Sequence, residues 1–296
     1  MLASVVIPTY NRSDKIGETI ASVCDQSVSE YEVLLVDDGS TDPRYGALLN
    51  EIDEQYDRVK IIRQENSGPA AARNRGIEEA KSEFVCFTDD DCIVPEDWIE
   101  RLVESFESGI GAVGGPLQPT EDAEERSPFA QLHRYRNQVV YDQPTEPTVG
   151  DTDLPMGGTA NICYRLEALE AVDGFDEAFP TAAGEDADLQ HRVAQEGWQM
   201  KFVPVVVHHN DEYSFTSFKE RAIRHGKGTY YFHRKHGIPR SKLRVAISLL
   251  GSVVFLPKEV LQTRDLTLAS LAVLERALSR YGELKARYND DVAMNI

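Results

Sequence analysis

Short apolar runs that each end in polar residues recur along the first third of the chain and constrain its fold most strongly. The runs cover residues 3–7, 32–36, 59–62 and 84–88. Between them lie loops and stretches with helical spacing of apolar residues, such as Ile16, Ile20 and Val23. This alternation of strands and helices predicts an α/β fold with a mostly parallel central sheet flanked by helices. In open sheets of this kind, ligands bind at the carboxyl ends of the strands.

Three consecutive carboxylates, Asp89, Asp90 and Asp91, follow the fourth run directly. Neighbouring negative charges repel one another, and a bound cation offsets that repulsion. Asp89 and Asp91, at alternate positions, can offer oxygen ligands to a Mg²⁺ or Mn²⁺ ion that also holds a phosphate. A solvated acidic turn is the alternative interpretation. Pro95, followed by two further acids, predicts that a helix begins there.

Polar residues also follow the other runs. Asp38, after the second run, can accept hydrogen bonds from a base or a ribose, although a lone Asp-Gly-Ser favours a simple turn. Arg73, near the start of an alanine-rich helix, can meet a diphosphate. Asn11 or Ser13 is expected to cap the first helix.

Taken together, these motifs resemble the family-2 glycosyltransferases of GT-A fold. The matching segments are Val6-Ile-Pro-Thr-Tyr-Asn11, Val36-Asp-Asp-Gly-Ser-Thr-Asp42, Asn66-x-Gly68, Ala72-Arg-Asn-x-Gly76 and Asp89-x-Asp91. They occur in the family's order and spacing, and the resemblance extends over roughly residues 3 to 210. It implies a GT-A (Rossmann-like) fold and a nucleotide-sugar donor, most often a UDP-sugar.

The resemblance also implies roles for individual residues. The residues implied to bind the nucleotide-sugar are Pro8, Thr9, Tyr10, Asn11, Asp38, Arg73 and Asp90. Asp89 and Asp91 are implied to hold the divalent metal on the diphosphate, with Asp90 as the alternative to Asp89. The cofactor expected from the family is therefore Mg²⁺ or Mn²⁺.

A second pair of carboxylates, Glu185 and Asp186, stands at the start of a later predicted helix. The helix dipole favours their ionised form, which a general base needs to take a proton from a sugar hydroxyl. Capping of the helix without a catalytic role is the alternative. The segment resembles the family's Glu-Asp motif, which implies that Asp186 is the catalytic base and that Glu185 lies beside it in the acceptor pocket.

Residues 201–207 form a further predicted strand that delivers His208 and His209 at its end. Related enzymes often have a histidine there, near the metal or the diphosphate. The resemblance implies His208 as a metal ligand, with the choice between His208 and His209 left open, and a structural hydrogen-bonding histidine is the alternative.

The charge of the chain limits its partners. A net charge of −19 argues against a nucleic-acid-binding protein, which would carry a basic surface. Arg outnumbers Lys, and a large acidic excess with few Lys is typical of halophilic proteins. The composition therefore favours a high-salt cytoplasm.

The four cysteines are scattered without metal-binding spacing, and the start of the chain already matches a strand rather than a signal segment. A reducing, cytoplasmic location is expected.

The C-terminal third differs in charge. Between residues 219 and 244, Lys and Arg side chains stand against Glu220 alone. Aromatic residues are interleaved with them, and the apolar stretch 245–256 follows. Such a sequence suits the surface of an anionic membrane or the phosphate of a lipid-linked acceptor. A helical pair whose basic face packs on acidic residues is the alternative. The polar segment 118–153 is expected on the acceptor side of the site.

The sequence therefore predicts a glycosyltransferase domain over residues 1–212 and a helical C-terminal region over 213–296 that contacts a membrane surface through residues 219–260. The expected reaction is inverting, metal-dependent transfer to a glycan or a lipid-phosphate-linked acceptor, as in lipid-linked oligosaccharide or surface-glycan biosynthesis. A non-catalytic sugar-nucleotide-binding module and a sugar-nucleotide pyrophosphorylase are the alternatives.

Overall fold

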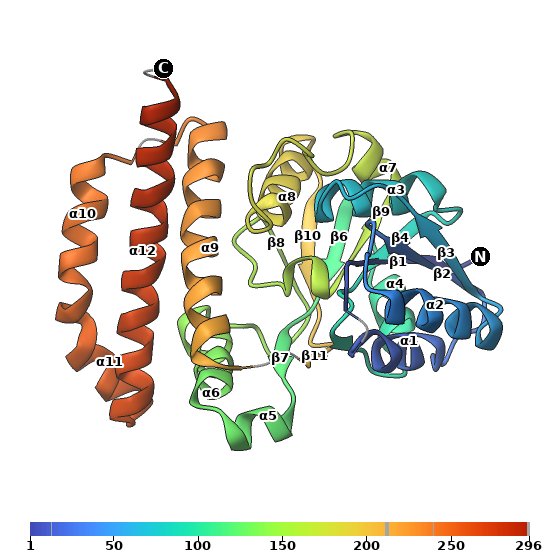
Figure 1. The fold of residues 1–296 in the computed structure, drawn as a ribbon, viewed down its shortest axis with the longest axis horizontal. Helices are drawn as coiled ribbons and strands as arrows, with labels where there is room; N and C mark the ends of the chain where they lie inside the picture. The colour runs from blue at the N-terminus through green and yellow to red at the C-terminus, as the bar shows by residue number, and fades with distance from the viewer. Residues whose placement is uncertain (13, 211–212, 239, 295–296) are drawn as a thin grey trace. The chain divides into compact units, whose positions relative to one another are not determined.

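The computed structural model describes residues 1–12, 14–210, 213–238 and 240–294, which form two compact units (Figure 1). Unit 1 comprises residues 1–118, 137–177 and 186–211. Unit 2 comprises residues 119–136 and 178–185 together with the described part of 212–296.

Unit 1 is built on an eight-stranded sheet with the strand order β3-β2-β1-β4-β9-β6-β10-β8. Its strands are β1 (Ala3–Thr9), β2 (Tyr31–Asp37), β3 (Val59–Arg63), β4 (Phe84–Phe87), β6 (Ile110–Gly114), β8 (Thr148–Gly150), β9 (Ile162–Arg165) and β10 (Gln199–Phe202). β1 pairs in parallel with β2 and β4, β2 pairs in parallel with β3, and β6 with β10. β9, between β4 and β6, and β8 at the edge are antiparallel to their neighbours. The mostly parallel sheet confirms the predicted fold class.

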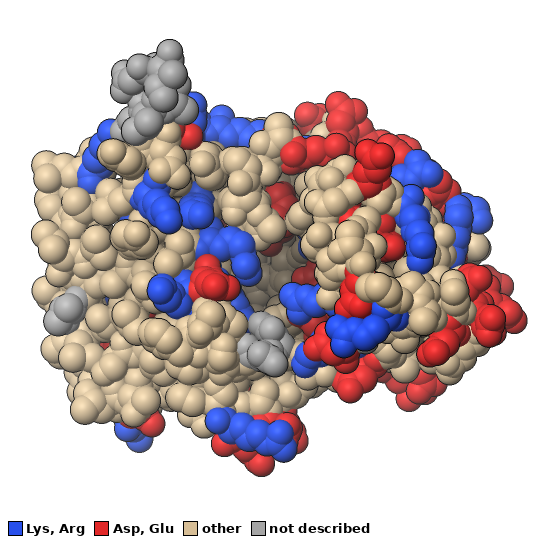
Figure 2. All heavy atoms as spheres, viewed as in Figure 1, with Lys and Arg blue, Asp and Glu red and all other residues tan. Residues whose placement is uncertain are grey.

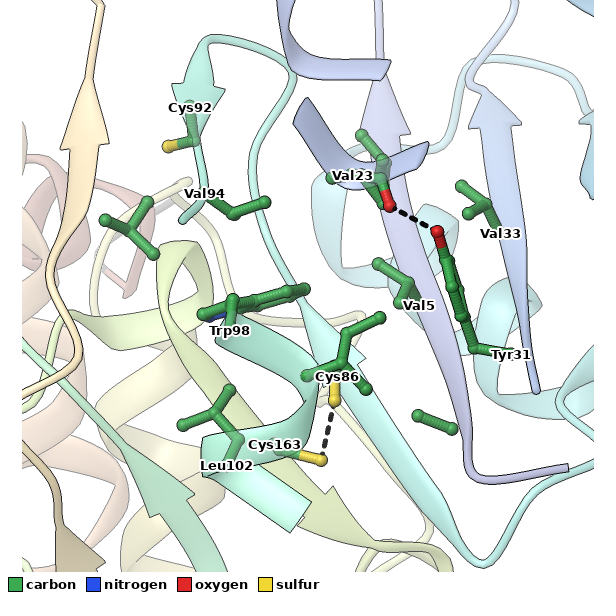
Figure 3. Close-up of a cluster of buried hydrophobic side chains, with 14 of the residues drawn as sticks. Val5, Val23, Tyr31, Val33, Cys86, Cys92, Val94, Trp98, Leu102 and Cys163 are labelled. Atoms are coloured by element: carbon green, nitrogen blue, oxygen red, sulfur yellow. Dashed lines mark hydrogen bonds between the residues drawn. The ribbon is translucent and has the colours of Figure 1, made fainter. Parts of the chain in front are cut away.

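Helices cover the sheet because its central strands are apolar on both faces. The helical elements of this part of the chain are α1 (Ile16–Cys24), α2 (Pro43–Gln55), α3 (Pro69–Glu79), α4 (Trp98–Glu104), η1 (Arg136–Val140), η2 (Gly158–Ala160), α7 (Leu166–Glu170) and α8 (Glu185–Gln195). Val5 belongs to one buried cluster and Val6 to the other, as the period-2 alternation of a strand requires. Figure 3 shows the first cluster, in which Trp98 packs beside Cys86 and Cys163, whose sulfurs lie 2.8 Å apart on β4 and β9.

Helix α4 begins at Trp98, three residues later than the sequence predicts from Pro95. The carbonyl of Pro95 accepts a hydrogen bond from the Gln26 side chain at 2.9 Å, and that of Glu96 accepts one from the backbone N–H of Ser27 at 2.8 Å. These contacts tie the segment before α4 to the residues that follow α1, and the Pro95 carbonyl also accepts from the Trp98 N–H at 3.1 Å in a turn that leads into α4.

The first helix is not capped by Asn11. Helix α1 has Lys15 at its N-cap, without a side-chain hydrogen bond. The Asn11 side chain instead accepts hydrogen bonds from the backbone N–H groups of Thr41 at 2.9 Å and Asp42 at 3.1 Å. Asn11 thus links two loops at the same edge of the sheet. Ser13, the other predicted cap, lies outside the described residues.

The predicted strand over residues 201–207 is two strands. β10 ends at Phe202, and Val207–His209 forms β11 in a separate three-stranded sheet of order β5-β11-β7, with β5 at Cys92–Ile93 and β7 at Leu117–Pro119. Pro204 lacks the N–H that a strand would need to continue its ladder. The chain turns there, with the Val205 N–H donating to the Val203 carbonyl at 2.8 Å.

Unit 2 is helical. Its elements are α5 (Glu121–Arg126), α6 (Pro128–Tyr135), α9 (Phe215–Lys235), α10 (Lys242–Leu250), η3 (Gly251–Phe255), α11 (Leu256–Thr263) and α12 (Leu266–Met294). α9 and α12 run side by side (Figure 1) at very close approach, because a Cβ on Gly226 would lie 1.8 Å from the Ser279 carbonyl oxygen. Leu132 and Tyr135 of α6 pack against Phe218 and Ala272 in the core of this unit. Over the described residues, no helix combines the length and the apolar character that crossing a bilayer would require.

Candidate active site

The carboxyl ends of β1, β2 and β4 meet at one edge of the sheet, because these strands are adjacent and parallel. There the hydroxyl of Thr9 donates to Asp90 Oδ2 at 2.7 Å, and the hydroxyl of Tyr45 donates to Thr9 Oγ1 at 2.6 Å. All three side chains are buried. Burial raises the pKa of Asp90 to about 7, and the hydrogen bond from Thr9 offsets part of that rise. Asp90 therefore belongs to a series of buried, hydrogen-bonded side chains beneath the site.

The two flanking aspartates are each paired with cations. Asp89 Oδ1 accepts from the Arg73 guanidinium at 3.0 Å, and about a third of the Asp89 side chain, 33%, is exposed. Asp91 Oδ2 accepts from Arg12 at 3.0 Å, while its Oδ1 lies 3.2 Å from Nε2 of His209. The predicted diphosphate residue Arg73 is itself only 5% exposed and is held by Asp89. Asp89 is thus the most open of the three carboxylates.

The histidine next to Asp91 is His209, although the sequence singled out His208. β11 pairs antiparallel with β5, which follows the aspartates, and aligns His209 with Cys92. Because successive side chains of a strand point to opposite faces, His208 and His209 project in opposite directions. The backbone N–H of Asn210 also donates to the Asp91 carbonyl at 2.8 Å. β11 therefore fixes the position of the acidic turn.

Asp38 organises a neighbouring loop. Its Oδ1 accepts from the Gln64 side chain at 2.8 Å and from the Ser67 N–H at 2.9 Å, and its Oδ2 accepts from the Gly68 N–H at 2.8 Å. A carboxylate offers about four lone-pair sites, so a single further site on Oδ2 is left for a ligand. Asp38 is 4% exposed. Its visible role is to hold the loop between β3 and α3.

The rest of the predicted nucleoside motif lies at the end of β1. Pro8 is within the strand and half-buried, whereas the Tyr10 ring just beyond it is 47% exposed. Asn11, with a left-handed φ of 53°, joins the loops after β1 and β2 through the hydrogen bonds described above. An exposed aromatic ring beside this fixed turn can stack on a nucleobase.

The second acidic motif forms the start of α8. Asp186 is partly exposed, and its Oδ1 accepts from the backbone N–H of Ala187 at 2.8 Å. Glu185, the first residue of α8, is 6% exposed. Asp188 is fully buried and is bound to Arg192 at 2.8 Å, so its role is structural. Of the carboxylates in this turn, Asp186 is the one best able to reach a substrate.

One loop connects Asp186 with the acidic turn after β4. Gly158 packs against Asp186 so closely that a Cβ on it would lie 2.5 Å from Asp186 Oδ2. Two residues later, the carbonyl of Ala160 accepts a hydrogen bond from Thr88, the residue before Asp89, at 3.1 Å. The glycine-rich segment 157–161 therefore links Asp186 to the acidic turn after β4, both of which belong to unit 1.

Asn161 at the end of this loop is fully buried, and both polar atoms of its side chain are hydrogen-bonded. Its Nδ2 donates to the carbonyls of Pro116 at 2.9 Å and Val205 at 2.7 Å, and its Oδ1 accepts from Trp98 Nε1 at 2.9 Å. A satisfied buried network of this kind makes the loop rigid.

Within the part of the chain that the structure describes, no three His, Cys, Asp or Glu side chains converge closely enough to hold a metal ion alone. Asp91 and His209 are in contact and Asp89 lies two residues away, which is a partial ligand set. Magnesium-type sites commonly use one or two carboxylates and take their other ligands from substrate phosphates and water. These residues fit a metal of that kind, one completed by a diphosphate.

Several residues of the site gave no signal in the sequence. Arg12 and Tyr45 contact the predicted residues Asp91 and Thr9 across long sequence separations. Asn161 holds the loop 157–161 through Trp98, Pro116 and Val205. Arg12 directly follows the motif that ends at Asn11, but neither charge nor spacing indicates that its partner is Asp91.

Comparison with known proteins agrees with this geometry. Residues 4–172 match the family model "Glycosyl transferase family 2". The glycosyltransferase AglE of Haloferax volcanii is 28% identical over 263 residues, covering 86% of this chain and 81% of that protein. The glycosyltransferase GlyG of Streptococcus pneumoniae is 40% identical over 107 residues, covering 36% of this chain and 35% of its own length.

Among solved structures, mannosyltransferase PcManGT from Pyrobaculum calidifontis, in complex with GDP-Man and Mn²⁺, has a TM-score of 0.66. It is 17% identical, with 94% of this chain and 86% of that chain covered. At this identity the likeness concerns the fold, which is GT-A. Since the family model matches more than half of the chain, from β1 to α7, the chain belongs to glycosyl transferase family 2 and is a glycosyltransferase.

Proposed function

We propose that this glycosyltransferase moves a sugar from a nucleotide-diphosphate sugar to an acceptor hydroxyl, with inversion at the anomeric carbon. The observation that carries the proposal is the loop 157–161, which joins the open carboxylate of Asp186 to the acidic turn after β4. A single displacement requires a base for the acceptor hydroxyl and a group that neutralises the leaving diphosphate. Asp186 would be the base, and a cation held by the acidic turn would neutralise the diphosphate.

The donor nucleotide would lie at the carboxyl edge of β1 and β2. Tyr10 would stack on the base, Asp38 would use its remaining lone pair, and Pro8 and Thr9 would form the floor. A UDP-sugar is the first candidate, because UDP is the commonest donor nucleotide among the resembling enzymes.

Asp89 and Asp91, with His209, would hold a divalent cation, Mg²⁺ or Mn²⁺, against the diphosphate. When bound, the ion supplies Lewis-acid neutralisation of the departing nucleoside diphosphate. Arg12 and Arg73 orient these carboxylates through contacts of 3.0 Å each.

Asp186 would take the proton from the acceptor hydroxyl. It lies in the first turn of α8, where the backbone N–H of Ala187 donates to its Oδ1 and orients the carboxylate. Glu185 is the neighbouring residue of the motif, and its low exposure argues for a positioning role in this proposal.

The acceptor we propose is a lipid-phosphate-linked glycan or the lipid phosphate itself, reached at a membrane surface through the C-terminal helices. Support comes from the basic stretch 219–244 and the apolar α10 that follows it. The proposal makes the protein a peripheral partner of the membrane.

An incorporation assay tests this function. Purified protein is incubated with radiolabelled UDP-, GDP- and dTDP-sugars, Mn²⁺ and an extract that contains lipid phosphates. The expected result is label in the organic phase, dependent on metal and absent in Asp186→Asn. Label transferred only to water-soluble glycans would refute the lipid-linked acceptor. A product with the donor's anomeric configuration, measured by NMR, would refute inversion.

A further inference from the structure

Unit 2 contains a hollow of about 350 Å³ near the end of α9. Its lining includes Tyr230, His233, Arg234, Ile238, Arg240 and Arg287. These residues come from α9, the segment after it and α12, so the hollow belongs wholly to unit 2. Figure 2 shows Lys and Arg gathered on the visible face of this unit, whereas Asp and Glu are frequent on unit 1.

The charges around the hollow do not balance. Glu283 is fully buried and accepts from Arg287 at 3.0 Å, Arg280 at 3.2 Å and Arg240 at 3.4 Å. Asp290 pairs with Arg234 and accepts a hydrogen bond from the hydroxyl of Tyr230. Among these described side chains, four guanidinium groups therefore face two carboxylates. Partly buried positive charge of this kind is stabilised by a further anion.

Buried nitrogen atoms at the hollow also lack partners. Nδ1 of His233 and Nε of Arg287 are inaccessible to solvent and have no hydrogen-bond acceptor among the described residues. The Arg287 guanidinium lies over the Tyr230 ring, 4.9 Å from its centre, which fixes its plane. Planar, pre-oriented guanidinium groups match the oxygens of a phosphate.

An apolar stripe begins beside the hollow. Ile238, which lines it, is 41% exposed, and α10 starts four residues later. Leu243, Ile247 and Leu250 of α10 are 69%, 58% and 80% exposed and recur at the spacing of one helix face. Val245 on the opposite side is buried. Phosphate-binding chemistry and an open apolar face thus adjoin along the chain.

We propose that the hollow binds the phosphate of a membrane lipid while the Leu243–Ile247–Leu250 stripe enters the acyl region of the bilayer. This inference rests on the membrane contact in the proposed function and names the residues that make it. A lipid is the one ligand that combines an anionic headgroup for the arginines with an apolar chain for the stripe.

The test is sedimentation of the full chain with phosphatidylcholine vesicles that carry phosphatidic acid, compared with pure phosphatidylcholine vesicles. The pocket variant is Arg234→Gln/Arg240→Gln, which leaves Arg280 and Arg287 on the buried Glu283. Its control is Arg126→Gln, an equally cationic residue of unit 2 on α5, with 77% of its side chain exposed. The stripe variant is Ile247→Ser/Leu250→Ser, and its control is Val149→Ser, 44% exposed in unit 1.

The expected result is binding to the phosphatidic acid vesicles alone, weakened roughly tenfold or more by the pocket and stripe variants and unchanged by the controls. Equal binding by pocket variant and parent, or no vesicle binding by the parent, would overturn the proposal. Vesicle binding that survives the stripe variant would overturn it too, because the apolar stripe would then make no contribution to the membrane contact.

Calorimetric binding of the nucleotide-sugar is measured on the same variants. Retained donor binding with lost vesicle binding shows that the fold and the donor site are intact. Failure of donor binding in the parent would instead count against the proposed function. A wrong lipid site and a wrong proposed function therefore give different results.

Discussion

Gly158 lies beside the carboxylate of Asp186: a Cβ on it would lie 2.5 Å from Asp186 Oδ2, so a larger residue would force this carboxylate to shift. The glycine also has a left-handed φ of 60°. The position of the proposed base therefore depends on a residue without a side chain.

Gly158→Ala is expected to displace Asp186 and lower kcat steeply, with a loss of about 1–3 kcal/mol in the free energy of unfolding from backbone strain. Gly46→Ala in α2 is the matched control, since a Cβ there has nothing within 4 Å. It is expected to stabilise the helix by about 1 kcal/mol. Turnover and urea unfolding measure both effects. Full activity in Gly158→Ala would contradict the role given to Asp186.

Asp186→Asn removes the proposed base while preserving shape and the hydrogen bond from Ala187. We expect kcat to fall about 10²- to 10⁴-fold, with donor affinity unchanged. Glu196→Gln, an exposed carboxylate just beyond the other end of α8, should leave both unchanged. An Asn variant that retains wild-type turnover would mean that another group takes the proton.

Asp90 should make the metal-free protein less stable as pH rises. Burial raises its folded-state pKa from 3.8 to about 7, so the folded state holds a proton that the unfolded chain has lost between these values. In that window the free energy of unfolding falls with increasing pH, by up to about 1.4 kcal/mol per unit. Above about pH 7 the loss of unfolding free energy caused by Asp90 stays constant.

Asp90→Asn cannot ionise and should flatten this slope, which urea unfolding in EDTA between about pH 5.5 and about pH 8 would reveal. Asp53→Asn, exposed on α2, should keep the parent's slope. Identical slopes in Asp90→Asn and the parent would show that Asp90 ionises normally.

The net charge of −19 predicts a requirement for salt. Raising KCl from about 0.1 M to about 1 M shortens the screening length from about 10 Å to about 3 Å and weakens repulsion among the acids. The thermal midpoint should therefore rise with KCl. Equal stability at low salt would remove the case for a halophilic protein.

The sheet and its acidic turn were predictable because strand–helix alternation and adjacent carboxylates are local patterns. The turn at Pro204 was harder to predict, because residues 201–207 look like one apolar strand in the sequence. The second sheet, in which β11 pairs with β5 and β7, forms between segments far apart in the chain. This affects the site, because the pairing of β11 with β5 brings His209, not His208, to Asp91.

Other features depend on contacts across long separations. The Arg12–Asp91 pair joins residues 79 positions apart, and Tyr45 meets Thr9 across 36. The sequence left open whether the basic stretch 219–244 meets a membrane or acidic residues; in the fold Arg234 and Arg240 pair with Asp290 and Glu283 of α12. Composition shows that the charges exist, but it cannot show which of them are neutralised in the fold.

The central claim is that the acidic turn binds the diphosphate of a sugar nucleotide through a divalent cation. Calorimetric titration with UDP-, GDP- and dTDP-sugars, with and without Mn²⁺ and in high KCl, tests it most directly. We predict metal-dependent binding of one nucleotide class, lost in Asp91→Asn and kept in Asp97→Asn, whose side chain is 48% exposed at the start of α4. Metal-independent binding, or no binding of any donor by the folded protein, would contradict the claim.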